Sequence, residues 1–119
     1  FMGLIPNTEV PRVISEMDIF VNCSHKESFG VNMVEAMACK TPVVATKTAG
    51  AMEVIEHNVT GVVLEDRKPE TMASAFKQLL SNPLILTKMG EAGRERVLRL
   101  YDWSKNVEIM ENLYKSLCK

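Results

Sequence analysis

The chain has 119 residues, of which 46% are hydrophobic and 24% are charged, and its formal net charge at pH 7 is −1. This length supports one domain or part of one, and the composition is typical of a globular protein. Because the near-neutral charge provides no basic field, we expect no nucleic-acid partner. No apolar run in the sequence approaches the roughly 20 residues that a membrane-spanning helix requires.

The chain contains three cysteines, Cys23, Cys39 and Cys118. Their odd number and irregular spacing predict free thiols in a reducing compartment, without disulfides or a zinc site. The sequence also has no Asp-x-Asp pair, so we expect no metal site. Because the chain opens with Phe1 and not with methionine, we expect it to be a fragment of a longer protein.

The first elements in chain order are an apolar segment and a short helix. Residues 1–5 are apolar and predict the end of a strand, followed by a turn at Pro6-Asn7. Asn7 or Thr8 is expected to cap the next helix. Apolar residues recur there at helical spacing; they are Val10, Val13, Ile14 and Met17.

Three short apolar runs then alternate with helical patterns. The runs at residues 19–21, 42–45 and 61–64 are typical of strands buried on both faces of a parallel sheet. A helix is expected over residues 29–39, since Pro42 follows its apolar pattern. A small-residue loop at residues 48–50 is expected to open a short helix through Met52, Val54 and Ile55. This alternation predicts an α/β fold with a parallel sheet flanked by helices.

The last part of the chain is predicted to be helical. Pro69 suits the first position of a helix that ends before Pro83. The next helix, residues 84–100, contains Gly90 and Gly93, which predict a close helix contact or a break. Asp102 is expected to cap a final helix with one apolar stripe, formed by Trp103, Val107, Met110, Tyr114 and Leu117.

Ligands of parallel α/β sheets bind outside the carboxyl ends of the strands. This rule brings His25, Glu27, Gly30 and the loop of residues 46–50 to one edge of the sheet. A glycine before a helix N-terminus is typical of an anion site, because unpaired N–H groups and the helix dipole meet there. The sequence therefore predicts a ligand that carries phosphate.

The two acids of this stretch admit two interpretations. Glu35 lies about five residues into the helix, roughly 7–8 Å along its axis from the helix start, so Glu27 and Glu35 could bind two hydroxyl-bearing parts of one ligand. Alternatively, Glu35 is a solvated helix-face acid and Glu27 only complements the helix dipole. His25 could bond a leaving phosphate or be an ordinary loop histidine, and Lys26 and Lys47 could neutralise phosphate.

Residues 27–46 read Glu-Ser-Phe-Gly-Val-Asn-Met-Val-Glu-Ala-Met-Ala-Cys-Lys-Thr-Pro-Val-Val-Ala-Thr. This run closely resembles the Glu-x7-Glu signature of group-1 (family 4) retaining glycosyltransferases of the GT-B fold, and the likeness extends along the whole chain. Two positions depart from the usual pattern. The run Ala49-Gly50-Ala51-Met52-Glu53 lacks one glycine and a proline, and Lys40 replaces a glycine.

The resemblance implies a donor-binding site. Glu27 would contact hydroxyls of the donor sugar as the catalytic residue, and Phe29, Gly30 and Val31 would offer backbone N–H groups to the sugar and diphosphate. Glu35 would hold the ribose hydroxyls, and His25 would complete the donor site. The partners would be a nucleotide-diphosphate sugar and a glycan or lipid acceptor, with no metal or cofactor.

The resemblance also implies that residues 1–119 are part of a single nucleotide-sugar-binding domain. Their partial Rossmann-like parallel sheet would be the C-terminal half of a GT-B nucleotide-binding domain. The first strands and the N-terminal acceptor domain would be absent. We therefore expect a contiguous three-stranded parallel core, an unpaired segment at residues 1–3, and an open edge at residues 19–21. Another chain, as in a fragment oligomer, or missing residues would cover this edge. The final helix would pack on the absent domain.

The sequence leaves other functions open. One is a different GT-B enzyme, such as a sugar-nucleotide epimerase, although the Glu-x7-Glu spacing argues against it. Another is a non-catalytic α/β nucleotide-binding module or a decayed transferase. For the transferase, the resemblance implies a cytoplasmic enzyme involved in polysaccharide biosynthesis, with peripheral association at the inner face of the membrane as an open alternative.

Overall fold

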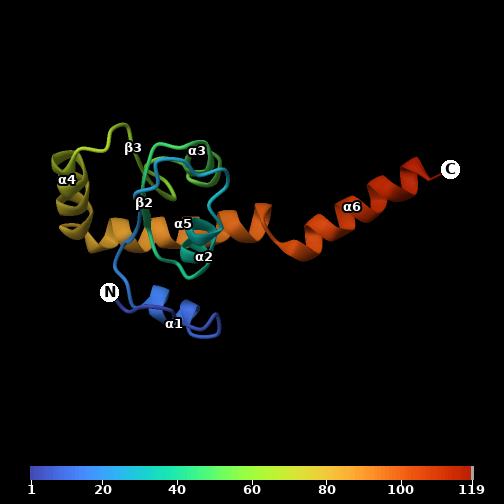
Figure 1. The fold of residues 1–119 in the computed structure, drawn as a ribbon, viewed down its shortest axis with the longest axis horizontal. Coiled ribbons are helices and arrows are strands. Elements are labelled where there is room, and N and C mark those ends of the chain that lie inside the picture. Colours follow the sequence, from blue (N-terminus) through green and yellow to red (C-terminus); the bar gives the residue numbers. More distant parts are fainter. Residues whose placement is uncertain (119) are drawn as a thin grey trace.

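The computed structural model describes residues 1–118. Over these residues the chain forms three strands and six helices around one sheet (Figure 1). The strands are β1 (Phe20–Asn22), β2 (Val43–Thr46) and β3 (Gly61–Leu64). The helices are α1 (Val10–Ser15), α2 (Val31–Ala38), α3 (Ala49–Val54), α4 (Pro69–Leu80), α5 (Pro83–Leu100) and α6 (Trp103–Leu117).

The three strands pair in the order β1-β2-β3, and both pairings are parallel. Val44 of the central strand lies opposite Val21 on one side and Val62 on the other. All four residues of β2 are buried, as expected for a short apolar strand that has helices on both faces. The predicted contiguous three-stranded parallel core is therefore confirmed.

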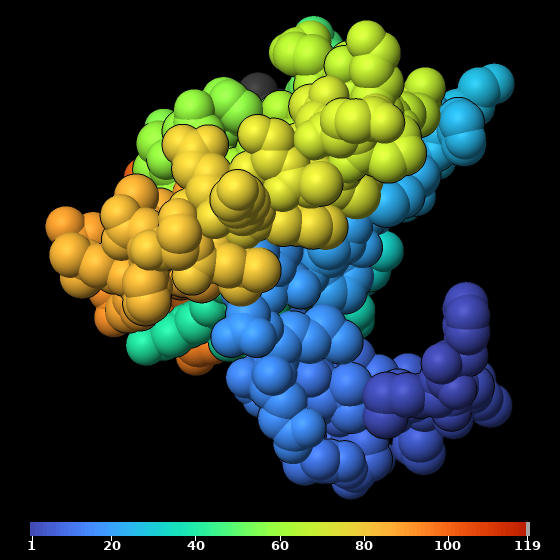
Figure 2. Space-filling model, turned by 90° about the vertical axis from the view of Figure 1, so that its left-hand side faces the viewer, coloured from blue at the N-terminus to red at the C-terminus, as the bar shows by residue number. Residues whose placement is uncertain are grey.

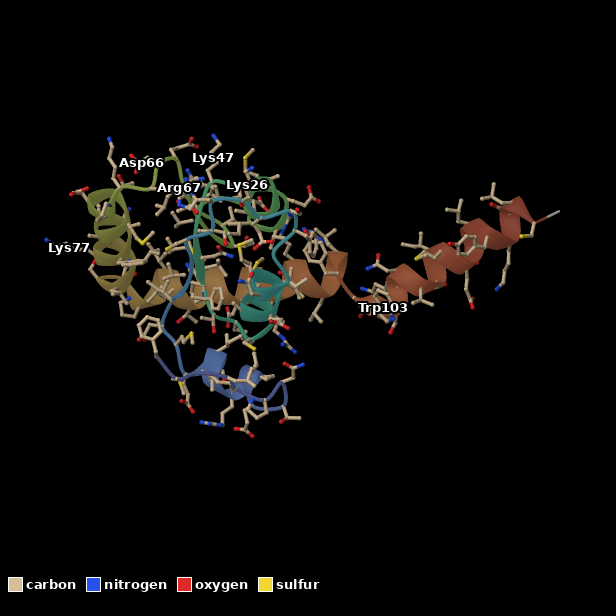
Figure 3. All side chains as sticks on the ribbon, viewed as in Figure 1. Lys26, Lys47, Asp66, Arg67, Lys77 and Trp103 are labelled. Atoms are coloured by element: carbon tan, nitrogen blue, oxygen red, sulfur yellow. The ribbon has the colours of Figure 1, made fainter. Side chains whose placement is uncertain are left out.

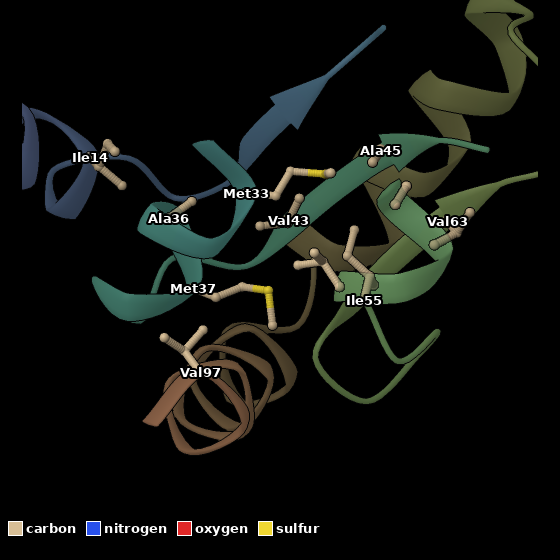
Figure 4. Close-up of a cluster of buried hydrophobic side chains, with 11 residues drawn as sticks. Ile14, Met33, Ala36, Met37, Val43, Ala45, Ile55, Val63 and Val97 are labelled. Atoms are coloured by element: carbon tan, nitrogen blue, oxygen red, sulfur yellow. The ribbon is translucent and has the colours of Figure 1, made fainter. Parts of the chain in front are cut away.

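Each face of the sheet has its own apolar cluster. On one face, side chains of α2, α3 and α5 pack with alternate residues of the strands (Figure 4). Met33, Met37 and Val43 in this cluster are fully buried. On the other face, Leu79 of α4 and Met89 of α5 pack against Val44. The two faces alternate along β2, as the pleat of a strand requires.

The two glycines of α5 mark a close helix contact, and the helix continues through both without a break. A Cβ added to Gly90 would overlap the backbone of Lys40, just after α2, and one added to Gly93 would lie 3.4 Å from Met37 Cγ. The absent side chain of Gly90 therefore lets α5 approach the end of α2, while Gly93 lies at ordinary contact distance. A close helix contact is one of the two outcomes that the sequence predicted.

Two predictions about the first strands are wrong. Residues 1–3 form no strand: Phe1 is exposed and Gly3 has φ +72°, because no neighbouring strand among the described residues pairs with them. The expectation that this segment would be unpaired is confirmed. The strand β1 is not buried on both faces, since Val21 is 39% exposed. As an edge strand, it borders an open apolar groove with Phe76 and Leu80 of α4 (Figure 2).

Two helix starts also differ from prediction. The N-cap of α1 is Glu9, whose side chain makes no capping bond, and Met17 lies beyond the end of this helix. Helix α2 begins at Val31, two residues later than expected, because Gly30 has a left-handed backbone with φ 88°. Elsewhere the predicted caps hold, and the side chain of Asp102 accepts a hydrogen bond from Ser104 N–H at 2.9 Å.

Helix α6 extends away from the rest of the chain (Figure 1). None of its described residues is buried, and Trp103 at its start is 77% exposed. The molecule is consequently elongated, with principal extents of 57 × 30 × 30 Å. The predicted apolar stripe is present but has no partner within residues 1–118.

Candidate functional site

The loop of residues 23–30, here called the β1–α2 loop, leaves the carboxyl end of β1 and is fixed there by two buried polar side chains. Asn22 Oδ1 accepts a hydrogen bond from Ser24 N–H at 2.9 Å. Thr46 Oγ1, at the end of β2, donates to the Ser24 carbonyl oxygen at 2.8 Å. Asn22 and Thr46 are 6% and 2% exposed, so both bonds lie away from solvent.

The middle of this loop is held by α3 and by the segment after β3. The backbone N–H of Gly50 donates to the Glu27 carbonyl oxygen at 2.8 Å, and Arg67 donates to the His25 carbonyl oxygen at 3.1 Å. Gly50 also lies directly against the backbone of Phe29. His25 and Glu27 therefore reach the same edge of the sheet, as predicted, on a loop with a defined path.

The N-terminus of α2 follows the loop. The N–H groups of Met33 and Val34 both bond to the Gly30 carbonyl oxygen, at 3.0 and 3.3 Å. The N–H groups of Val31 and Asn32 precede these and have no acceptor in their own helix. Val31 and Asn32 are exposed. The helix dipole and these amides give this end of α2 a positive potential that favours an anion.

The two candidate acids occupy different surroundings. Glu27 is half-buried, and its Cγ would lie 3.2 Å from a Cβ on Gly30, so its stem packs beside the start of α2. Glu35 is exposed and lines a groove of about 430 Å³ between α1 and α2. The groove is lined by Asn7, Val10, Pro11, Ile14, Glu35, Ala38, Cys39 and Arg94.

Phe29 is 37% exposed and its ring contacts the ring of Tyr101 edge-on, with centroids 5.4 Å apart. Tyr101 in turn donates from its hydroxyl to the Glu53 carbonyl oxygen at 3.3 Å. The loop is thus supported by the end of α5 as well as by the neighbouring loops. Of the predicted site residues, the structure brings His25, Glu27, Phe29, Gly30 and Val31 together and places Glu35 one helical turn along α2.

Basic side chains surround this edge of the molecule, where Lys26, Lys47 and Arg67 project together (Figure 3). Lys47 pairs with Glu65 at 2.7 Å, so part of its charge is already neutralised. Asp66 accepts a hydrogen bond from Lys68 N–H at 3.0 Å, which lowers the pKa of its carboxyl. Lys26 and Arg67 have no ion-pair partner among the described residues, and Arg67 already donates to the His25 carbonyl oxygen.

Four residues hold the site in shape, and the sequence predicted a supporting role for none of them, although it placed the loop of residues 46–50 at this edge. They are Asn22, Thr46, Gly50 and Arg67, and each acts on the backbone of the β1–α2 loop. In the sequence, Asn22 and Thr46 could have been recognised as polar residues at the ends of apolar strands. Gly50 could have been recognised as a glycine in the first turn of a helix. Within residues 1–118 no cluster of three metal-ligating side chains occurs, and no helix combines the length and apolarity needed to cross a bilayer.

Comparison with known proteins shows that the chain matches part of larger proteins. The sequence family described as "Glycosyl transferases group 1" matches residues 1–96. N-acetyl-alpha-D-glucosaminyl L-malate synthase of Bacillus anthracis is 35% identical over 96% of the chain, which spans 29% of that enzyme. The chain thus covers less than a third of this curated relative.

Two solved structures match the fold. Sucrose-phosphate synthase from Thermosynechococcus elongatus superposes on 98% of the chain with a TM-score of 0.92 at 32% identity, and the chain covers 29% of it. The Anabaena protein HepE, in complex with UDP and glucose, matches 97% of the chain with a TM-score of 0.87 at 27% identity, and 31% of its own length is covered. The predicted partial Rossmann-like sheet of a GT-B enzyme is confirmed, and this chain belongs to the group 1 glycosyl transferases.

Proposed function

We propose that this chain is the donor-binding part of a retaining glycosyltransferase, which transfers a sugar from a nucleotide-diphosphate sugar to a glycan or lipid acceptor. The observation that carries the proposal is the β1–α2 loop, which ends in Gly30 and two unpaired amides at the carboxyl edge of a parallel sheet. The match to HepE, a protein solved with UDP and glucose, supports the same class of ligand.

Each predicted site residue has a role in this proposal. Glu27, half-buried beside Gly30, contacts hydroxyls of the donor sugar, and His25 bonds the phosphate end of the donor. The backbone N–H groups of Phe29, Gly30 and Val31 face the sugar and diphosphate. Glu35, exposed on α2 at the groove toward α1, holds the ribose hydroxyls.

The chemistry assigned to the site is stabilisation of a leaving group. In the transfer, the bond between sugar C1 and the diphosphate oxygen breaks, and the acceptor oxygen forms a bond to C1 on the same face. The products are the glycosylated acceptor, a nucleoside diphosphate and the proton of the acceptor hydroxyl. Negative charge grows on the diphosphate, where the α2 dipole and its amides stabilise it. Further phosphate-binding cations and the acceptor site would come from parts of the enzyme outside this chain.

We further propose that the full enzyme works in the cytoplasm, with its acceptor either in solution or at the inner face of the membrane. The open edge of β1 and the exposed groove beside it would be covered by preceding residues of the enzyme or by a second chain. Residues 1–119 would be part of a single domain that the preceding residues complete.

The proposal is tested by titrating the full-length protein with UDP-, GDP- and ADP-sugars. We expect one nucleotide to bind and Glu35→Ala to weaken it about tenfold, as loss of a hydrogen bond to a charged group predicts. Unchanged nucleotide affinity in Glu35→Ala would refute the ribose assignment. Glu27→Gln should lower sugar transfer while nucleoside diphosphate affinity stays the same. Binding without any sugar transfer would instead indicate a non-catalytic nucleotide-binding module.

A further inference from the structure

Two asparagines connect the end of β1 to the first turn of α2. Asn22 Nδ2 donates a hydrogen bond to Asn32 Oδ1, with 3.3 Å between the atoms. We propose that Asn22 and Asn32 form a positioning pair, which sets the direction of the first-turn amides of α2 toward the donor diphosphate. This inference rests on the proposed donor-binding function, and it assigns neither side chain a contact with the reacting atoms.

Asn22 is suited to positioning and not to ligand contact. Its residue is 6% exposed, and both ends of its amide are used within the protein. The oxygen accepts from Ser24 N–H at 2.9 Å while the nitrogen donates to Asn32. One buried side chain therefore fixes the start of the β1–α2 loop and the start of the following helix together. A buried amide that lost either partner would be left unsatisfied, so the arrangement is strongly preferred.

Asn32 transmits this constraint to the helix. Its Oδ1 also accepts a hydrogen bond from Met33 N–H, at 2.8 Å. The same N–H bonds to the Gly30 carbonyl oxygen, so the third residue of α2 is tied twice. The two preceding N–H groups, of Val31 and Asn32, are those without an acceptor in the helix. The Val31 N–H lies on the peptide unit whose carbonyl oxygen, that of Gly30, accepts from Met33 N–H. The Asn32 N–H lies on the residue whose side chain is held by Asn22 and Met33, so the asparagine pair restrains the orientation of both amides.

Loss of the asparagine pair should affect one part of the ligand more than the other. Amides stabilise a phosphate only when they point at its oxygens. The part of the ligand assigned to Glu35 lies one turn further along α2. Loosening the first turn should therefore weaken the diphosphate contact and spare the nucleoside contact. A general structural defect would weaken both contacts alike.

The test measures the affinity of the full-length protein for a nucleoside diphosphate by calorimetry, and for the matching nucleoside by NMR titration. The variants are Asn32→Ala, Asn22→Leu and the double variant. We expect each single variant to raise Kd for the nucleoside diphosphate about tenfold, and Kd for the nucleoside less than about twofold. Because both substitutions break the same hydrogen bond, the double variant should be no weaker than the weaker single variant.

Asn82→Ala is the matched control. Asn82 also accepts a backbone N–H, from Ile85 at 3.3 Å, but at the start of α5. The substitution Asn82→Ala should lower the melting temperature and leave the affinities for the nucleoside diphosphate and the nucleoside unchanged.

Should Asn22→Leu fail to fold, Asn32→Ala at its exposed position still decides the question. Unchanged nucleoside diphosphate affinity, equal losses for both ligands, or additive effects would overturn the pairing. Failure of the unmodified protein to bind any nucleoside diphosphate would instead overturn the donor-binding function itself.

Discussion

Gly50 lies against the backbone of Phe29 so closely that a Cβ on Gly50 would be 2.6 Å from the Phe29 carbonyl oxygen and 2.8 Å from its nitrogen. Backbone atoms cannot move aside as the end of a flexible side chain can. The same glycine donates its N–H to the Glu27 carbonyl oxygen. The loop that carries Glu27, the candidate catalytic residue, therefore packs against Gly50 in the first turn of α3.

Gly50→Ala should displace the β1–α2 loop. Overpacking of this kind typically costs about 1–3 kcal/mol of folding stability. In the full-length protein we expect sugar transfer to fall more than tenfold, since small displacements of positioned groups cost rate strongly. Steady-state kinetics and chemical denaturation measure the two effects. Met52→Ala, at an exposed position of the same helix α3, should leave both unchanged; equal losses in the two variants would contradict the explanation.

Lys40→Gly should stabilise the protein. Lys40 follows α2 with φ 62°, a left-handed conformation that costs a residue with a side chain about 1–2 kcal/mol. Glycine removes this cost but has more freedom in the unfolded chain, so we expect a net gain of about 0.5–1 kcal/mol in urea denaturation. Asn58→Gly is the comparison, since Asn58 has φ 63° but asparagine tolerates this region. A gain at Asn58 as large as at Lys40 would argue against the mechanism.

Gly90→Ala and Gly93→Ala should have opposite effects although they lie on the same helix. A Cβ at position 90 would overlap the backbone of Lys40, whereas one at position 93 would make ordinary contacts with Met37 at 3.4–3.5 Å. We expect Gly90→Ala to lower the free energy of unfolding by about 2 kcal/mol or more. Gly93→Ala should raise it by about 0.5–1 kcal/mol through helix propensity. Thermal and urea denaturation distinguish the two; a loss at both positions would show that α5 tolerates no side chain along this contact.

Cys39 should react more slowly with alkylating reagents than Cys23 and Cys118. Burial raises the pKa of the Cys39 thiol, so less of it is thiolate at neutral pH, and the thiolate is the reactive form. Cys23 and Cys118 are exposed. Pulse labelling with iodoacetamide, followed by peptide mass spectrometry, should find Cys39 labelled last near pH 7. Raising the pH should increase the labelling rate of Cys39, because more of its thiol becomes thiolate. Labelling of Cys39 before Cys23 and Cys118 near pH 7 would contradict this.

Much of the fold follows from local sequence patterns. The runs that became β2 and β3 are continuously apolar and flanked by turn residues, and Pro69 and Asp102 mark the starts of α4 and α6. The first segment was predicted wrongly because an apolar run becomes a strand only where another strand pairs with it. Residues 1–3 have no such partner among the described residues. The local pattern could not reveal this, whereas the family resemblance did imply an unpaired segment.

The candidate site was predictable in outline but not in its supports. The spacing of Glu27, Gly30 and Glu35 along one chain segment indicated a loop and a helix N-terminus. The groups that hold the loop, among them Thr46 and Arg67, lie 22 and 42 residues away from their partners in the sequence. Only the sheet order brings them close. Contacts of this kind depend on tertiary structure, so a local pattern could not reveal them.

The hydrogen bonds that hold the β1–α2 loop have a common property. Those to Ser24, His25 and Glu27 all end on the backbone N–H or carbonyl groups of the loop, and their partners lie outside it. The path of the loop is therefore independent of most of its own side chains. Substitutions at positions such as 25, 26 and 28 can change the chemistry presented to a ligand without moving the loop. During divergence, a family built on this arrangement could acquire new ligand preferences at little cost in folding.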